Sequence, residues 1–168
     1  MDRAQRLDEY KHGYARLGAA LANLPLEMWH YKTAEQEWSV HEIIMHLVDS
    51  EVHSYIRCRT ILAEPGTTLM QFDAHRWAMA LGYAGQDVHD GLALIAIIRR
   101  VTGALLETIP AALWRHYGNH SQRGRMTLDD WLATYTEHLA AHISQLETCY
   151  TAWRAANNIE VRQEEHDS

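Results

Sequence analysis

The sequence predicts an all-α protein, a four-helix bundle with long connections, and three observations support that prediction. Apolar residues in four long segments recur at helical spacing rather than in alternation. Only 3 prolines occur in 168 residues, and all of them stand between these segments. Helix-start signals precede several of the segments. Four amphipathic helices that each bury one apolar face are typical of a bundle.

The first two helices have clear boundaries in the sequence. One is expected from about Asp2 to Leu24, because Pro25 cannot continue it. The next follows Trp38, where Ser39 and Glu42 have the spacing of a capping box, in which each side chain bonds the backbone N–H of the other residue. It is expected to reach about Ala63.

Two more long helices complete the bundle. They are expected at about Asp87–Thr108 and Thr127–Ala156, with Thr127 as the N-cap of the last. Residues 64–86 and 110–126 are expected to be long connections, the former containing a short helix at Asp73–Leu81. The bundle domain should therefore cover residues 1–158, and the polar residues 159–168 are expected to form a C-terminal tail.

Composition excludes several classes of protein. The net charge of −7, from 22 acidic and 15 basic residues, argues against a nucleic-acid ligand, which needs a clustered basic face. No apolar run approaches the roughly 20 residues that span a bilayer, and no secretory signal is visible at the start. Cys58 and Cys149 form no CxxC motif and fit a buried core better than a nucleophile, so a reducing cytoplasm is expected.

Histidine is the residue type that points to chemistry, with 12 in the chain. His138 and His142 are four residues apart on the last predicted helix, so both imidazoles project from one face. Two such nitrogens can reach one metal ion at about 2.0–2.1 Å. The spacing matches the HExxH motif, but no glutamate stands between the two histidines. The alternative is a pair at the helix surface with no ligand.

A third ligand has to come from another helix, and His46 is the strongest candidate. It lies among apolar residues two turns into the second helix, where the alternative role is that of a core histidine. Asp49 could orient a ligand by accepting a hydrogen bond. His53 is a competing ligand, and His41, in the first turn, is expected to be solvated or close to the cap.

Three segments together resemble a known family. They are Trp38–Glu51, with its Trp-Ser, Glu and His-Leu pattern, the central Phe72–Ala78, and Gly124–Gln145 with its two histidines. In this order they resemble the DinB-like superfamily of bacterial four-helix bundles, and the resemblance covers roughly Leu7–Trp153. It implies a divalent metal, zinc or nickel, held by His46, His138 and His142, with positions open for water or substrate.

Characterised branches of that superfamily include S-transferases that use a low-molecular-weight thiol such as bacillithiol or mycothiol. The resemblance therefore implies a thiol-dependent S-transferase acting on a small electrophile. Family members often carry a histidine at the loop position of His120, which could act as an acid, a base or a substrate contact, or be a solvated loop residue.

Other functions stay open from the sequence. The same site would suit a metal-dependent hydrolase that uses metal-bound water, or a metal-stabilised bundle that binds a ligand without catalysis. A metal-free bundle with core histidines is the plainest alternative. A small-molecule substrate and a homodimer are expected, since bundles of this kind often pair through exposed helix faces.

Overall fold

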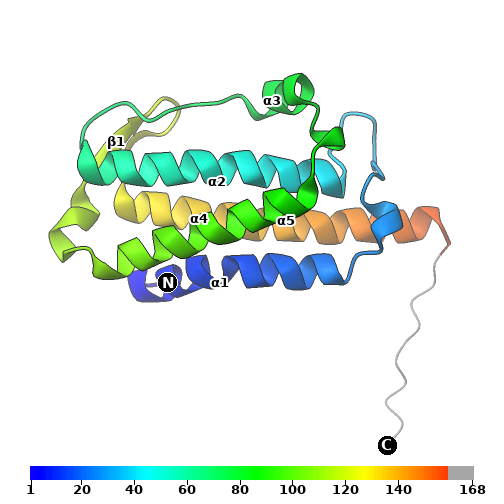
Figure 1. The fold of residues 1–168 in the computed structure, drawn as a ribbon, viewed down its shortest axis with the longest axis horizontal. Helices are drawn as coiled ribbons and strands as arrows, with labels where there is room; N and C mark the ends of the chain where they lie inside the picture. Colours follow the sequence, from blue (N-terminus) through cyan, green and yellow to red (C-terminus); the bar gives the residue numbers. More distant parts are fainter. Residues whose placement is uncertain (159–168) are drawn as a thin grey trace, which may run out of the picture.

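The computed structural model describes residues 1–158, and long helices account for most of them (Figure 1). The four long ones are α1 (Arg3–Ala22), α2 (Val40–Ala63), α4 (Val88–Thr108) and α5 (Leu128–Ala156). They confirm the predicted four-helix bundle, with boundaries within two residues of those expected. The predicted tail, residues 159–168, lies outside the described residues. Within residues 1–158, no helix has the length and apolar character that a bilayer crossing requires.

Two helix starts form as the sequence predicts. The hydroxyl of Ser39 accepts the N–H of Glu42 at 3.3 Å, and the Glu42 carboxylate accepts the N–H of Ser39 at 2.8 Å, which completes the capping box. At α5 the hydroxyl of Thr127 accepts the N–H of Asp130 at 3.2 Å. These bonds satisfy donors that the first helical turn leaves free, and so they fix where α2 and α5 begin.

The four long helices form a square in cross-section. The helix α1 packs against α4 and α5, and α2 packs against the same two. Figure 1 shows that α1 and α5 run in one direction and α2 and α4 in the other. Because the neighbours α2 and α4 are parallel, the chain between them has to return along the bundle. That return is the segment 64–87, which passes over α2 and contains α3 (Ala74–Leu81) (Figure 1).

A β-hairpin that the sequence analysis did not predict lies between α4 and α5. Strands β1 (Tyr117–His120) and β2 (Gly124–Thr127) are antiparallel, within a stretch that was expected to be an irregular connection. The hairpin also pairs with the segment 64–73, since the N–H of Leu69 donates to the carbonyl of Asn119 at 3.0 Å. These short strands pair in part with residues about fifty positions earlier in the sequence. The local pattern of apolar residues therefore does not predict the hairpin.

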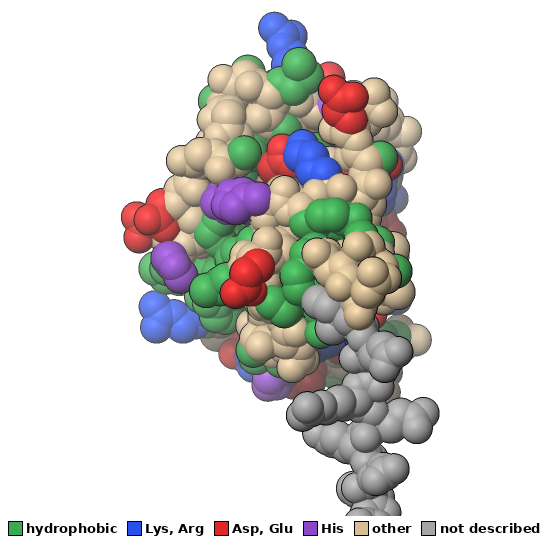
Figure 2. Space-filling model, turned by 90° about the vertical axis from the view of Figure 1, so that its right-hand side faces the viewer, with side chains coloured by type: hydrophobic (Ala, Val, Ile, Leu, Met, Phe, Trp, Pro, Cys, Tyr) green, Lys and Arg blue, Asp and Glu red, His purple; other side chains and the backbone are tan. Residues whose placement is uncertain are grey.

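Single turns of 3-10 helix fill the remaining connections. They are η1 (Leu26–Met28), η2 (Tyr83–Gly85) and η3 (Ala111–Arg115). Figure 2 shows the end of the bundle at which α5 finishes, where hydrophobic, acidic, basic and histidine side chains are interspersed.

The interior has an apolar cluster toward each end of the bundle and buried polar side chains between them. The first cluster includes Leu17, Ile43, Leu47, Ile95 and Leu146, and the second includes Tyr10, Ile61, Leu106, Trp131 and Leu132. Between them lie the buried ion pair of Glu51 and Arg99 and, toward the first cluster, a group of histidines. The apolar clusters hold the helices together. The polar side chains between them are the candidates for a functional site.

Candidate metal centre

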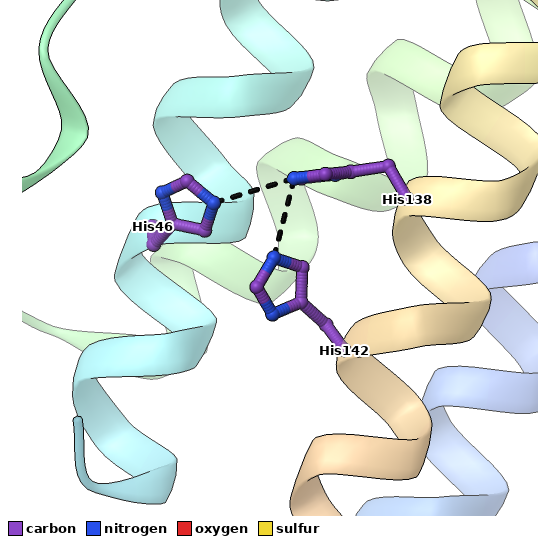
Figure 3. A group of neighbouring side chains, drawn as sticks. All are labelled: His46, His138 and His142. Atoms are coloured by element: carbon purple, nitrogen blue, oxygen red, sulfur yellow. Dashed lines mark hydrogen bonds between the residues drawn. The ribbon is translucent and has the colours of Figure 1, made fainter. Parts of the chain in front are cut away.

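Three histidines from two helices meet inside the bundle. His46 comes from α2, and His138 and His142 come from one face of α5, with their rings turned toward one another (Figure 3). Nε2 of His138 lies 3.3 Å from Nε2 of His46 and 3.2 Å from Nε2 of His142. The structure therefore brings together the three histidines that the resemblance identifies as ligands. We refer to them as the histidine cluster.

The spacing of the three nitrogens fits a shared cation. Two ligands at about 2.0–2.1 Å from a tetrahedral ion lie about 3.3 Å apart. A ring nitrogen carries either one hydrogen or one lone pair, so Nε2 of His138 cannot form a good hydrogen bond to both neighbours at once. A cation between the rings would accept all three lone pairs together.

The outer nitrogens of the cluster differ in whether they have a hydrogen-bond partner. Nδ1 of His46 and Nδ1 of His138 are buried without a hydrogen-bond partner among the described residues. Burying polar atoms without partners is costly, so the fold gains nothing from these rings through their own hydrogen bonds. Nδ1 of His142 does have a partner, the side-chain oxygen of Gln145 at 2.8 Å. That bond places the hydrogen on Nδ1 and leaves Nε2 of His142 with its lone pair free.

Burial keeps the histidine cluster neutral. It lowers the pKa of His46 and of His138 to about 3, and the neighbouring His142 adds to both shifts. Burial also lowers the pKa of His142, against the opposing effect of Gln145. Neutral imidazole is the form that binds a metal, so these residues are ready ligands at neutral pH.

A cavity of about 220 Å³ opens beside the cluster. Its walls come from α2, α5, the crossover segment and the hairpin, and they include His46, Ser50, His120, Tyr135 and His138. No aspartate or glutamate lines this cavity in the described part of the chain. A small molecule in the cavity would therefore contact two residues of the cluster and a wall without negative charge.

His120, the predicted loop candidate, lines the cavity from the end of β1. Only 9% of its surface is exposed, so it is not the solvated loop histidine of the alternative interpretation. Its Nδ1 accepts the N–H of Gln122 at 3.3 Å, which leaves the hydrogen of the neutral ring on Nε2. Burial lowers its pKa, with smaller effects from Arg57 and Arg123.

Three other sequence candidates lie apart from the cluster. The carboxylate of Asp49 accepts the hydroxyl hydrogen of Tyr83, so in this structure it does not orient a ligand. Residues three positions apart lie on roughly the same helix face, so the spacing from His46 favoured this role, but the carboxylate instead contacts Tyr83 in η2. His53, the competing ligand, bonds the Asp49 carbonyl through Nδ1 at 2.8 Å and stacks on Phe72.

The structure also shows the environment of His41. It was expected to be solvated or close to the cap. It lies in the first turn beside the N-cap Ser39 and is buried, with Nε2 bonded to the carbonyl of Gln86 at 3.0 Å and its ring stacked on His30. The crossover returns to this point, and the sequence of the first helical turn gives no sign of that. Both cysteines are buried as predicted, and burial raises the pKa of Cys58 to about 12, so its thiol is a poor nucleophile.

The sequence analysis missed two residues that complete the site. Gln145 follows His142 by three positions on one helix, so the i,i+3 rule could have identified it. Arg57 lies eleven residues after His46, about three turns along the same face of α2, and it also lines the cavity. No motif marks it, because its place depends on the crossover and on α5.

A helical bundle in which three histidines from two helices converge beside a cavity defines a class, the metal-binding helical bundles. Within that class the family is shown by the sequence: the DinB superfamily profile matches residues 9–146. The chain belongs to the DinB superfamily, as the motifs predicted.

Named relatives come from several bacilli. The chain is 27% identical over 110 residues to YfiT of Bacillus subtilis, covering 65% of this chain and 62% of that protein. It is 27% identical over 113 residues to a protein of Oceanobacillus iheyensis, covering 65% of this chain and 64% of the relative. The names of both relatives propose a metal-dependent hydrolase. The chain thus spans a little under two thirds of the length of these relatives.

The fold also matches a solved structure. The structure of YfiT from Bacillus subtilis superposes with a TM-score of 0.81. That protein is described as a probable metal-dependent hydrolase with an unusual four-helix bundle topology. The match covers 95% of this chain and 91% of that one at 21% identity. At this identity the likeness establishes the fold alone.

Proposed function

We propose that the protein is a metal-dependent enzyme that acts on a small electrophilic molecule in the cavity beside the histidine cluster. One observation carries the proposal: the Nε2 atoms of three neutral imidazoles converge at a spacing suited to one ion. The metal-dependent names of the relatives support it.

His46, His138 and His142 would hold the ion. A divalent metal there supplies a nucleophile at neutral pH, because it lowers the pKa of a coordinated thiol or water. Three neutral nitrogens suit zinc and nickel, and we propose one of these two. The cytoplasmic location and the homodimer stay predictions from the sequence.

A low-molecular-weight thiol is the first candidate for the nucleophile, which makes the enzyme an S-transferase. The reason is the absence of a carboxylate from the described cavity wall. A general base would assist attack by metal-bound water, whereas a thiol has a much lower pKa than water and depends less on such a base. His120 would then donate a hydrogen bond to the substrate or product, because its neutral ring carries hydrogen on Nε2.

Hydrolysis is the second candidate, favoured by the names of the relatives. In that case His120 would accept the proton of the attacking water at Nε2, which requires the tautomer with hydrogen on Nδ1 and the loss of the bond from the N–H of Gln122. The two candidates need the same ion and the same cavity, and they differ in what attacks the substrate.

A paired assay distinguishes the candidates. Purified protein is loaded with zinc or nickel and tested with a panel of thiols against monochlorobimane, and separately with p-nitrophenyl acetate without thiol. Turnover in the first assay alone supports transfer, and turnover in the second supports hydrolysis. In either case a chelator should abolish it and added metal restore it. A protein that binds metal but turns over in neither assay would be a non-catalytic binding bundle, which would contradict the proposal.

A further inference from the structure

Arg57 has an unusual environment for an arginine. It is 8% exposed and lines the same cavity as His46 and His138, from a point about three turns further along α2. Its Nε donates to the carbonyl of Met70 at 2.8 Å, and its Nη1 donates to the hydroxyl of Tyr135 at 2.6 Å. Nη2 forms no hydrogen bond to any residue that the structure describes.

The charge of Arg57 is not balanced within the site. Neither of its partners is a carboxylate, and the described wall of the cavity contains no acidic side chain. Burying a cation without a counter-charge is costly, and an anion in the cavity would supply the missing counter-charge. By contrast, the other deeply buried arginine of the described chain, Arg99, lies 2.6 Å from Glu51.

A second arginine lies on the opposite wall. Arg123, in the turn of the hairpin, lines the cavity and donates from Nη1 to the hydroxyl of Thr134 at 3.1 Å. It is exposed and also borders a neighbouring hollow that contains Asp130 and Glu137. Both arginines help to lower the pKa of His120, so all three side chains share one electrostatic environment.

We propose that Arg57, assisted by Arg123, binds an anionic oxygen group, a carboxylate or a phosphate, of the molecule on which the enzyme acts. His46 and His138 line the same cavity as Arg57, which lies about three turns of α2 beyond His46. The anion would therefore anchor the ligand by charge-assisted hydrogen bonds, and its reacting atom would face the cluster. This placement of the reacting atom rests on the proposed function, but the binding of an anion at Arg57 does not.

The inference is tested with inorganic phosphate and acetate as probes, by calorimetry on both metal-free and zinc-loaded protein. Wild-type protein should bind at least one of the anions in both preparations. Arg57→Gln should weaken this binding about tenfold. Arg123→Gln should weaken it about threefold, as expected for an exposed charge. The anion that binds more tightly identifies the ligand as a phosphate or a carboxylate.

The matched control is Arg59→Gln, since Arg59 is on the same helix but lies over the ring of Tyr55, outside the cavity. It should bind the anions as wild type does. Arg57→Lys keeps the charge and removes the guanidinium, and it should fall between wild type and Arg57→Gln. Circular dichroism verifies that each variant folds. If Arg57→Gln unfolds, Arg123→Gln and Arg57→Lys still test the inference.

Equal binding by wild type and the Arg57 variants would overturn the inference, and so would the absence of binding to wild type in both preparations. Failure of the proposed function is a separate result. It would appear as missing metal or missing turnover while metal-free protein still binds the anion. Failure of this inference would leave metal content and turnover in place without selective anion binding.

Discussion

Arg99 and the histidine cluster are two polar groups inside the same bundle, and they differ in how far the protein itself provides their partners. Arg99 donates to Glu51 from Nε and Nη2, and its other bonds go to the carbonyls of Tyr10 and Tyr135 at 3.0 Å. Its guanidinium thus uses four of its five hydrogens within the protein. The histidine cluster instead directs three Nε2 atoms at one point, and these nitrogens cannot all serve as hydrogen-bond partners for one another.

The difference shows how to distinguish a structural polar group from a binding site. Arg99 is buried together with a carboxylate, and even the backbone of α1 accommodates it: a Cβ at Gly13 would collide with its Nη1. The histidines are buried without any such partner on the inside of the cluster. The guanidinium of Arg99 is completed by the chain itself and stabilises the fold, although Oε2 of Glu51 has no partner among the described residues. The histidine cluster differs in that its three Nε2 atoms converge on one point, an arrangement that a cation would complete.

The largest expected effect comes from breaking the completed group. Arg99→Met leaves the carboxylate of Glu51 buried without its counter-charge and should lower the free energy of unfolding by about 3–5 kcal/mol. Urea unfolding measures it. Arg100→Met, at the exposed neighbouring position of α4, is the control and should change stability by less than about 0.5 kcal/mol. A stable Arg99→Met protein would mean that this pair does not support the fold.

Removing a residue of the histidine cluster should affect metal far more than fold. His46→Ala and His138→Ala should each lose most of the bound metal, while His12→Ala, on the exposed surface of α1, should keep it. Elemental analysis of the purified proteins checks this. In wild type, metal at a hundred times its Kd should add about 2.7 kcal/mol to the stability, and a chelator should remove that gain. Unchanged metal content in both site variants would overturn the assignment.

A smaller effect on metal binding is expected from Gln145, which bonds a proposed ligand and not the ion. Gln145→Leu removes the acceptor that fixes the ring of His142, and metal affinity should fall about 10–100-fold while the saturated protein still binds its ion. Competition with a chromophoric chelator measures the affinity. Ser144→Ala, at the exposed neighbouring position, serves as the control. If the two variants bind equally well, Gln145 has no part in the site.

The smallest effect concerns pH in the metal-free protein. Burial lowers the pKa of His46 and His138 to about 3, against about 6.5 in the unfolded chain. Between these values the unfolded chain binds protons that the folded one does not, so stability falls as the pH drops below about 6.5 and levels off near pH 3. Urea unfolding at pH 7 and pH 5 should show a smaller loss for His138→Leu than for wild type. An equal loss of stability in both proteins would mean that His138 is not among the groups that cause this pH dependence.

Helix boundaries were predictable because their causes are local. The capping box of Ser39 and Glu42 and the N-cap Thr127 act within one turn, and each forms as predicted. The hairpin was not predictable in this way, because β1 takes part of its pairing from the segment 64–73. The burial of His41 has the same cause, since the carbonyl that accepts its hydrogen belongs to Gln86 at the end of the crossover.

The candidate site was predictable in part for the same reason. The spacing of His138 and His142 is local, His46 was a candidate from its position among apolar residues, and the family resemblance joined the three into one ligand set. The structure brings these three together, and their role as ligands stays a proposal. The environment of Arg57 could not be predicted, because its partners, the carbonyl of Met70 and the hydroxyl of Tyr135, come from the crossover and from α5.

The separation of His46 and His138 by 92 positions has a consequence for biosynthesis. When the earlier histidine leaves the ribosome, its two counterparts have not been translated, and the nascent chain has no complete chelate to offer. With the proposed ligand set, the ion would be captured only after the last helix has docked on the others. Metallation would then be a late event, and the free metal available to the finished protein would decide which ion it acquires.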